Sequence, residues 1–225
     1  MKKLLSTIIT LAALGSASLS AHAQDVKASA EAGQKKAALC IGCHGIHGYQ
    51  ASFPEIHKVP MISGQGAKYV VSALNAYKKG ERKHPTMKAI ATTLSDQDMA
   101  DLAAFYEQQR KGGAAAAPAA ASAVAAKPSD QVAKLLEQGK CNSCHGADYN
   151  SPIDGTYPKL AGQHADYLYV SLKAYQTTNN PQVGRSNAIM MGMAQPFTPA
   201  QLKLLAQYLS SLPSDLQTVP QSRFR

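Results

Sequence analysis

The sequence of 225 residues contains no tryptophan and only four cysteines. Four cysteines are too few to build a scaffold held together by disulfides. Beyond the N-terminal segment, no apolar run approaches the roughly 20 residues that a membrane-spanning helix needs. Sustained alternation of apolar and polar residues is also missing, so the sequence predicts no β-sheet. These absences favour an all-α fold and leave the cysteines available for other chemistry.

The first residues have the pattern of an export signal. Two lysines form a basic start, residues 4–14 form an apolar run, and residues 21–23 read Ala-His-Ala, which is typical of a cleavage site. The apolar run is too short to span a membrane comfortably. We therefore expect residues 1–23 to be a cleaved signal peptide, the mature chain to begin near Gln24, and the protein to be periplasmic.

Four sequence blocks occur twice and in the same order. The most distinctive are a C-x-x-C-H-G motif and a P-x-[IL]-[SA]-G-Q motif. The first copies lie at residues 40–45, 60–65, 69–77 and 87–95, and the second copies lie at residues 141–146, 158–163, 167–175 and 190–198. A shared order at nearly one spacing indicates two copies of a single small domain.

The segment between the copies, residues 112–128, is rich in alanine and contains proline and glycine. Val124 is its only large apolar residue, and such a composition is typical of a linker. We therefore expect one domain at residues 24–111 and a second at residues 129–225, each near the small end of what folds alone.

Apolar spacing and capping residues predict the same helices in both copies. Ser95 and Asp98 form a capping box at the start of one helix, and Thr198 and Gln201 form one at the start of its counterpart. Apolar residues at i, i+3, i+4 and i+7 predict a middle helix in the first copy, and most of this spacing recurs in the second. The middle helices are expected around residues 70–77 and 168–175, and shorter helices before the cysteine pairs over Ala28–Leu39 and Asp130–Gly139.

The C-x-x-C-H motif is the attachment site of a c-type haem. Cys40 and Cys43, three positions apart at a helix start, can form thioethers with two vinyl groups on one edge of a porphyrin, and His44 then lies under the iron. The second motif supplies Cys141, Cys144 and His145 in the same roles. The sequence therefore predicts two covalently bound haem c groups with iron.

Three alternative roles for the cysteine pairs fit the sequence less well. A thioredoxin-like redox pair requires a βαβ pattern, which is absent. A zinc site with four thiolates would have to join two pairs that lie a whole domain apart. Two disulfides between positions i and i+3 would stabilise little. The full motif, repeated with its own histidine, favours haem.

The sixth iron ligand should come from the same copy. Met87 and Met190 occupy equivalent places between the middle and last helices, in what reads as a loop, and a thioether suits an iron that changes redox state without changing ligands. His84 is a rival for the first haem. Met191 and Met193 are neighbours in the second copy, but the repeat alignment selects Met190.

This set of motifs resembles the dihaem cytochrome c4 family, and the likeness covers both copies. The resemblance implies two tandem class I cytochrome c domains, all-α and joined by the Ala/Pro-rich linker, with their haem propionate edges facing each other.

The resemblance also implies supporting roles for residues around each haem. Proline carbonyls would accept from the axial histidines, glutamines would line the haem, tyrosines would pack beside it, and arginines would pair with propionates. These residues are Pro60, Gln65, Tyr77 and Arg82 in the first copy and Pro158, Gln163, Tyr175 and Arg185 in the second. The sequence departs from the family in its long linker and in an insertion that carries His57 and Lys58.

The formal charge of +9 is concentrated in part around Met87. Five cations surround it in sequence: Lys78, Lys79, Arg82, Lys83 and Lys88. They form either a solvated surface or a docking rim for membrane or soluble redox proteins with acidic surfaces. Peripheral association with a membrane is compatible with this charge. Nucleic acid is not expected as a partner, because export removes the protein from it.

Two classes of function fit these motifs. An electron carrier needs each iron to be six-coordinate, and each copy supplies a histidine and a candidate methionine. A haem subunit of a periplasmic dehydrogenase, as in sulfide or thiosulfate oxidation, or a peroxidase-like enzyme would need an open iron position or a distal base. No repeated His or Glu lies beside the methionines, and no flavin or nicotinamide fingerprint occurs. We therefore expect an electron-transfer protein with no catalytic residue and no small-molecule substrate. The resemblance implies delivery from a quinol-oxidising cytochrome bc complex to a terminal oxidase.

Overall fold

The computed structural model describes residues 26–110 and 127–220. The predicted signal peptide at residues 1–23 and nearly all of the predicted linker at residues 112–128 lie outside the described residues. Among the residues described, no helix has both the length and the apolarity needed to cross a membrane.

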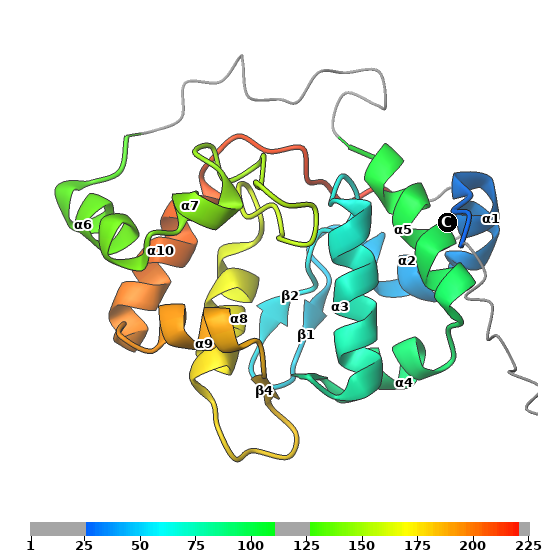
Figure 1. Cartoon of the computed structure of the whole chain (residues 1–225), viewed down its shortest axis with the longest axis horizontal. Helices are drawn as coiled ribbons and strands as arrows, with labels where there is room; N and C mark the ends of the chain where they lie inside the picture. Colours follow the sequence, from blue (N-terminus) through cyan, green and yellow to red (C-terminus); the bar gives the residue numbers. More distant parts are fainter. Residues whose placement is uncertain (1–25, 111–126, 221–225) are drawn as a thin grey trace, which may run out of the picture.

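Two helical domains lie side by side (Figure 1). The elements of the first domain are α1 (Ala30–Lys36), α2 (Ala38–His44), β1 (Gln50–Ala51), β2 (His57–Lys58), α3 (Ala67–Lys79), β3 (Arg82–Lys83), α4 (Pro85–Thr92) and α5 (Asp96–Gln108). Those of the second are α6 (Asp130–Gly139), α7 (Asn142–His145), α8 (Ala165–Gln176), β4 (Gly184–Arg185), α9 (Ala188–Ala194) and α10 (Pro199–Ser210). The middle helices α3 and α8 flank the boundary between the domains in Figure 1.

The last helix of each domain forms the centre of its core. Both predicted capping boxes are present, at the starts of α5 and α10, and they satisfy backbone N–H groups that the first helical turn leaves free. Leu102 of α5 and Leu202 of α10 are 2% and 0% exposed. Burying a leucine side chain contributes about 2 kcal/mol, so these positions anchor α5 against α1 and α2, and α10 against α6 and α8.

The helix predicted over Ala28–Leu39 is instead two helices that meet at Ala37. Ala37 is 0% exposed and belongs to the core cluster with Leu102 and Phe105 of α5. The break is slight, because the backbone of Ala37, with φ of −72° and ψ of −3°, stays in the right-handed helical region. The helix predicted over Asp130–Gly139 is confirmed with the same bounds.

Short strands, which the sequence did not predict, join the two domains. β3 and β4 pair antiparallel across the boundary, and Arg82 lies opposite Arg185. A second pair, β1 with β2, forms a hairpin within the first domain. Each strand has only two residues, too few to show an alternating pattern in sequence.

The segment after α10 returns to the first domain and adds to this boundary (Figure 1). The N–H of Gln217 donates to the carbonyl of Ser63 over 3.0 Å, and its side-chain amide donates to the carbonyl of Gln109 over 2.7 Å. Gly64, next to Ser63, has a φ of 85° and lies directly against the Asp215 backbone, so a side chain would not fit there.

Candidate functional site

A largely apolar cavity of about 1000 Å³ extends through both domains. Its volume is at the top of the range of about 300–1,000 Å³ usual for ligand pockets. All of the predicted covalent and axial residues line it. These are Cys40, Cys43, His44 and Met87 from the first domain and Cys141, Cys144, His145 and Met190 from the second. The predicted supporting prolines, glutamines, tyrosines and arginines line it as well.

The four cysteines form no disulfide, and the first of each pair lies at the start of a short helix. Cys40 lies in the first turn of α2, and Cys141 is the residue that precedes α7. Burial raises the pKa of both of these thiols. The described residues contain no group of three or more His, Cys, Asp or Glu side chains placed to hold a metal ion, so the two pairs do not form a joint zinc site.

Each C-x-x-C-H histidine is held by a proline carbonyl. His44 Nδ1 donates to the carbonyl of Pro60 over 2.8 Å, and His145 Nδ1 donates to that of Pro158 over 2.9 Å. Burial lowers the pKa of both imidazoles. The second ring nitrogen, Nε2, therefore remains for a ligand bond in each domain. A neutral imidazole oriented through Nδ1 is what a metal-bound histidine requires.

The two methionines lie in the first turns of α4 and α9, and the prediction that they lie in loops was wrong. Helix caps explain the difference. Asn187 accepts from the N–H of Met190 over 3.0 Å, and His84 accepts from the N–H of Met87 over 3.4 Å through Nδ1. Pro85 adds a second start signal, because proline is favoured in the first turn of a helix.

The rival ligands also have definite places. His84 lines the cavity beside Met87, but its Nδ1 is used in capping α4, and burial lowers the pKa of its imidazole. Met193 lines the cavity and is 44% exposed, whereas Met191 does not belong to the lining. The structure thus keeps the repeat-related pair, Met87 and Met190, in equivalent positions.

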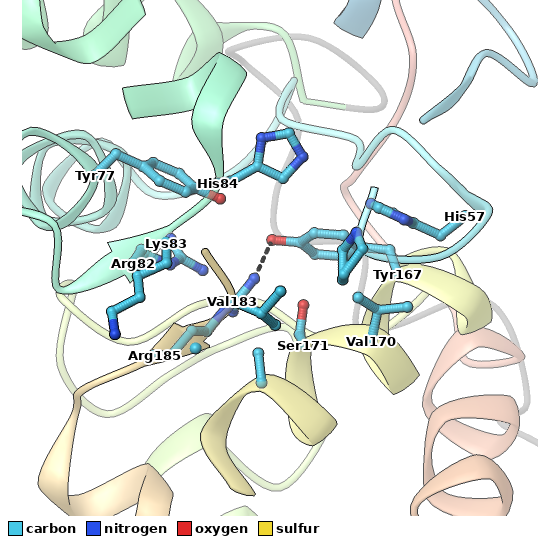
Figure 2. A pocket seen from close by; sticks show the side chains of 13 residues that line it. His57, Tyr77, Arg82, Lys83, His84, Tyr167, Val170, Ser171, Val183 and Arg185 are labelled. Carbon is cyan, nitrogen blue, oxygen red and sulfur yellow. Dashed lines mark hydrogen bonds between the residues drawn. The ribbon is translucent and has the colours of Figure 1, made fainter. Parts of the chain in front are cut away.

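Two arginines face each other where the domains meet (Figure 2). Arg82 donates to the hydroxyl of Tyr69 over 3.0 Å, and its guanidinium lies 5.1 Å from the ring centre of Tyr77. Arg185 repeats this arrangement with Tyr167 at 3.2 Å and Tyr175 at 5.4 Å.

No carboxylate of the described residues pairs with either arginine, and the buried Nε of Arg82 has no hydrogen-bond partner. Arginine stays charged in proteins, so a buried cation at Arg82 and a half-buried one at Arg185, both beside the cavity, call for anionic groups. The two propionate carboxylates of a haem meet this requirement. The free thiols, the oriented histidines and these arginines together fit the predicted cofactor.

The glutamines of the two P-x-[IL]-[SA]-G-Q motifs reach into the opposite domain. Gln163 Nε2 donates to the carbonyl of Met61 over 2.8 Å, and its Oε1 accepts the N–H of Met61 over 3.0 Å. Gln65 forms the same pair with Lys159, over 3.1 Å and 2.9 Å. Both side chains are 4% exposed. The sequence placed these residues beside the haem of their own copy and missed their contact across the boundary.

The insertion in the first copy also contacts the second domain. Glu55 forms an ion pair with Lys173 over 2.9 Å, and the N–H of Lys58 donates to Asp166 over 3.0 Å. His57 is buried, and its Nδ1 donates to the carbonyl of Glu55 over 2.8 Å. An insertion that departs from the family pattern is therefore part of the domain boundary, a role that the sequence did not suggest.

The predicted cationic rim around Met87 is smaller than the sequence implied. Arg82 is buried, Lys78 donates to the carbonyl of Leu94, and Lys83 donates to the carbonyl of Asn180 in the other domain, each lysine over 2.6 Å. The exposed lysines of this group are Lys79 and Lys88.

Comparisons with known proteins agree with this geometry. The Cytochrome c family model matches residues 30–110 and 129–213. The chain is 31% identical to cytochrome c4 of Stutzerimonas stutzeri, over 94% of this chain and 99% of that one. It is 28% identical to a thiosulfate dehydrogenase electron acceptor from Stutzerimonas stutzeri strain A1501, over 87% and 89%. Among solved structures, reduced recombinant cytochrome c4 from Pseudomonas stutzeri matches with a TM-score of 0.62 and 30% identity, over 83% of this chain and 100% of that one.

Proposed function

This chain belongs to the dihaem cytochrome c4 family, and on that premise we propose that it carries single electrons in the periplasm from a quinol-oxidising cytochrome bc complex to a terminal oxidase. It is an electron-transfer protein rather than an enzyme, and it has two covalently bound haem c groups in two tandem cytochrome c domains.

The proposed ligand sets are the same in both domains. Cys40 and Cys43 would hold one haem through thioethers, and His44 Nε2 and the Met87 sulfur would bind its iron. Cys141, Cys144, His145 and Met190 would hold the other haem in the same way. When bound, each haem supplies an iron that accepts and releases one electron. The residues of the chain orient the two histidines through the carbonyls of Pro60 and Pro158.

The arginines on β3 and β4 are proposed to bind the propionates at the domain boundary. Their guanidinium groups are oriented by tyrosine hydroxyls and rings in the same way in each domain. Because Arg82 and Arg185 lie opposite each other, the propionate edges of both haems would meet there. This arrangement would bring the two redox centres together and allow electron exchange between them.

One observation supports the carrier proposal: a histidine and a methionine of each domain line the same cavity, as two complete iron ligand sets would require. An iron with both axial positions filled by protein has no open site for substrate chemistry. The test is carbon monoxide added to the reduced holoprotein. We expect no fast change in the haem spectrum; rapid formation of a carbon monoxide complex at either haem would contradict the proposal.

A thiosulfate dehydrogenase is a second candidate donor, because one of the relatives bears the name of its electron acceptor. Stopped-flow reduction of the oxidised protein distinguishes the donors. Purified cytochrome bc complex with quinol and purified thiosulfate dehydrogenase with thiosulfate are compared at equal concentrations. Faster reduction by the bc complex supports the proposed route, and faster reduction by the dehydrogenase assigns the protein to thiosulfate oxidation.

A further inference from the structure

A single peptide group connects each crossing glutamine to the axial histidine of the other domain. The carbonyl of Pro60 and the N–H of Met61 belong to one peptide group. Its oxygen accepts from His44 Nδ1 over 2.8 Å, and its N–H donates to Gln163 Oε1 over 3.0 Å. A hydrogen-bonded chain therefore runs from the second domain to a histidine of the first.

The same chain exists in the opposite direction. The peptide group of Pro158 and Lys159 accepts from His145 Nδ1 over 2.9 Å and donates to Gln65 Oε1 over 2.9 Å. Each glutamine also donates to the carbonyl of the residue that it accepts from, which fixes the plane of its amide. Because both glutamines are buried and make equivalent contacts, the pair is an internal feature of the domain boundary rather than incidental surface packing.

These bonds affect the electron density at the histidine. A peptide group that donates through its N–H has a more negative oxygen, because hydrogen bonds in a chain polarise one another. A stronger acceptor at Nδ1 makes the imidazole a better electron donor through Nε2. A better donor stabilises ferric iron and lowers the reduction potential, and hydrogen bonding around the ligand is one of the means by which a protein sets that potential.

We propose that Gln163 and Gln65 are positioning residues that each lower the reduction potential of the haem in the opposite domain. The inference rests on the proposed axial roles of His44 and His145. Contacts at the domain boundary would then help to set the reduction potentials of both haems. Separation of the domains would break both hydrogen-bonded chains and raise both potentials together.

The test is a redox titration of the full-length dihaem protein with Gln163→Met, which keeps the side-chain length and removes the amide. The potential of the first-domain haem should rise, and that of the second-domain haem should stay constant. The equilibrium constant for reduction of this haem should change by less than tenfold, which corresponds to a shift of less than 59 mV in its one-electron reduction potential. Gln65→Met should give the reverse result. The haems are assigned from Met87→Ala and Met190→Ala, each of which changes one of the two potentials.

A second variant remains informative if Gln163→Met does not fold. Gln163→Glu keeps an oxygen that accepts the Met61 N–H, so the potential of the first-domain haem should stay at or below the wild-type value. A rise in that variant would overturn the proposal. So would a Gln163→Met shift that appears only at the second-domain haem, or at neither haem.

Two controls separate this effect from looser packing. Gln176→Met removes a glutamine whose amide donates to Ala194 and Phe197 within the second domain, and it should leave the first-domain potential unchanged. Glu55→Gln combined with Lys173→Met removes an ion pair across the boundary at constant net charge. If this double variant gave the same first-domain shift as Gln163→Met, domain packing would be the cause and the proposal would fail.

Failure of the proposed ligation would look different. If the oxidised wild-type protein lacked the visible band that reports a sulfur ligand to iron, the axial assignment would be refuted. An intact band with unchanged potentials in Gln163→Met would refute only the role of the glutamines.

Discussion

Arg82 lies directly opposite Arg185 in the strand pair β3–β4, so the two domains meet with like charges facing each other. Tyrosine hydroxyls and rings orient both guanidinium groups, and no carboxylate of the described residues neutralises them. Repulsion between these cations opposes this contact unless anions lie between them. The proposed binding of haem propionates by both arginines would supply those anions.

Replacing one of these cations should lower a haem potential. A nearby positive charge favours the added electron of ferrous iron, so Arg82→Met should make reduction less favourable. The expected effect is on the order of 1 kcal/mol at an effective dielectric constant of about 20. A redox titration measures it, with Arg82→Lys as the variant that keeps the charge and should retain most of the potential. Equal potentials in wild type and Arg82→Met would show that the arginine does not act on the haems.

The axial methionines can be tested one domain at a time. Met87→Ala and Met190→Ala should each remove half of the weak band that reports a sulfur ligand to ferric iron. Each should also lower the potential of its own haem, because a thioether favours the ferrous state. Absorption spectra of the oxidised variants and redox titrations provide the measurements.

Two neighbouring residues serve as controls for that assignment. Met193→Ala should leave the band intact, although Met193 also lines the cavity. If Met87→Ala kept the full band and His84→Ala changed the spectrum, His84 would be the sixth ligand of the first haem.

Local signals in the sequence were sufficient to predict most of the helices. The capping boxes at Ser95 and Thr198 and the cap at Ser129 involve residues three apart, so their geometry depends little on the rest of the fold. Histidine is not among the usual capping residues, so the cap at His84 gave no such signal and Met87 was expected in a loop. The proline that follows His84 is the one local sign of a helix start at this point.

Contacts between the domains could not be predicted in the same way. A glutamine that recurs in both copies can bind within its own domain or across to the other, and the repeat looks identical in the two cases. The way the two domains pack together, which includes the pairing of β3 with β4, selects the second alternative for Gln65 and Gln163. The ion pair of Glu55 with Lys173 is equally invisible, because the two residues lie 118 positions apart.

Stability of the first domain should fall in acid because of Asp101. Its buried carboxylate accepts from Lys36 Nζ over 2.7 Å, from the N–H of Ser29 over 2.8 Å and from Gln97 over 2.8 Å. The hydrogen bond from Lys36 holds the pKa of Asp101 below its ordinary value. A lowered pKa in the folded state stabilises the fold above the unfolded-state pKa of about 3.9, and this stability is lost as the pH falls through the folded-state pKa.

We therefore expect the free energy of unfolding to decrease below about pH 4, and Asp101→Asn to make that decrease smaller. At pH 7 the same substitution should cost about 2 kcal/mol, the usual value for a hydrogen bond to a charged group. Denaturant unfolding followed by circular dichroism at pH 7 and pH 3 measures both quantities. Identical pH dependences in the two proteins would show that Asp101 does not contribute to acid sensitivity.

Two exposed lysines near Met87 mark the surface through which we expect electrons to be exchanged. Lys79 and Lys88 are the exposed lysines of the group around Met87, because Lys78 and Lys83 are bound to backbone carbonyls. Exposed charges of one sign near a redox centre raise the rate of encounter with a partner of opposite charge. Lys79→Glu combined with Lys88→Glu should therefore slow electron exchange with an acidic partner.

Lys134→Glu combined with Lys203→Glu is the matched control, since it changes the net charge equally at exposed positions of the second domain. The difference between the two variants should shrink as salt is raised, because the Debye length falls from about 10 Å at 0.1 M to about 3 Å at 1 M. Haem spectra should not change in either variant. Equal slowing by both pairs at low salt would assign the effect to net charge and would rule out a docking surface at the first domain.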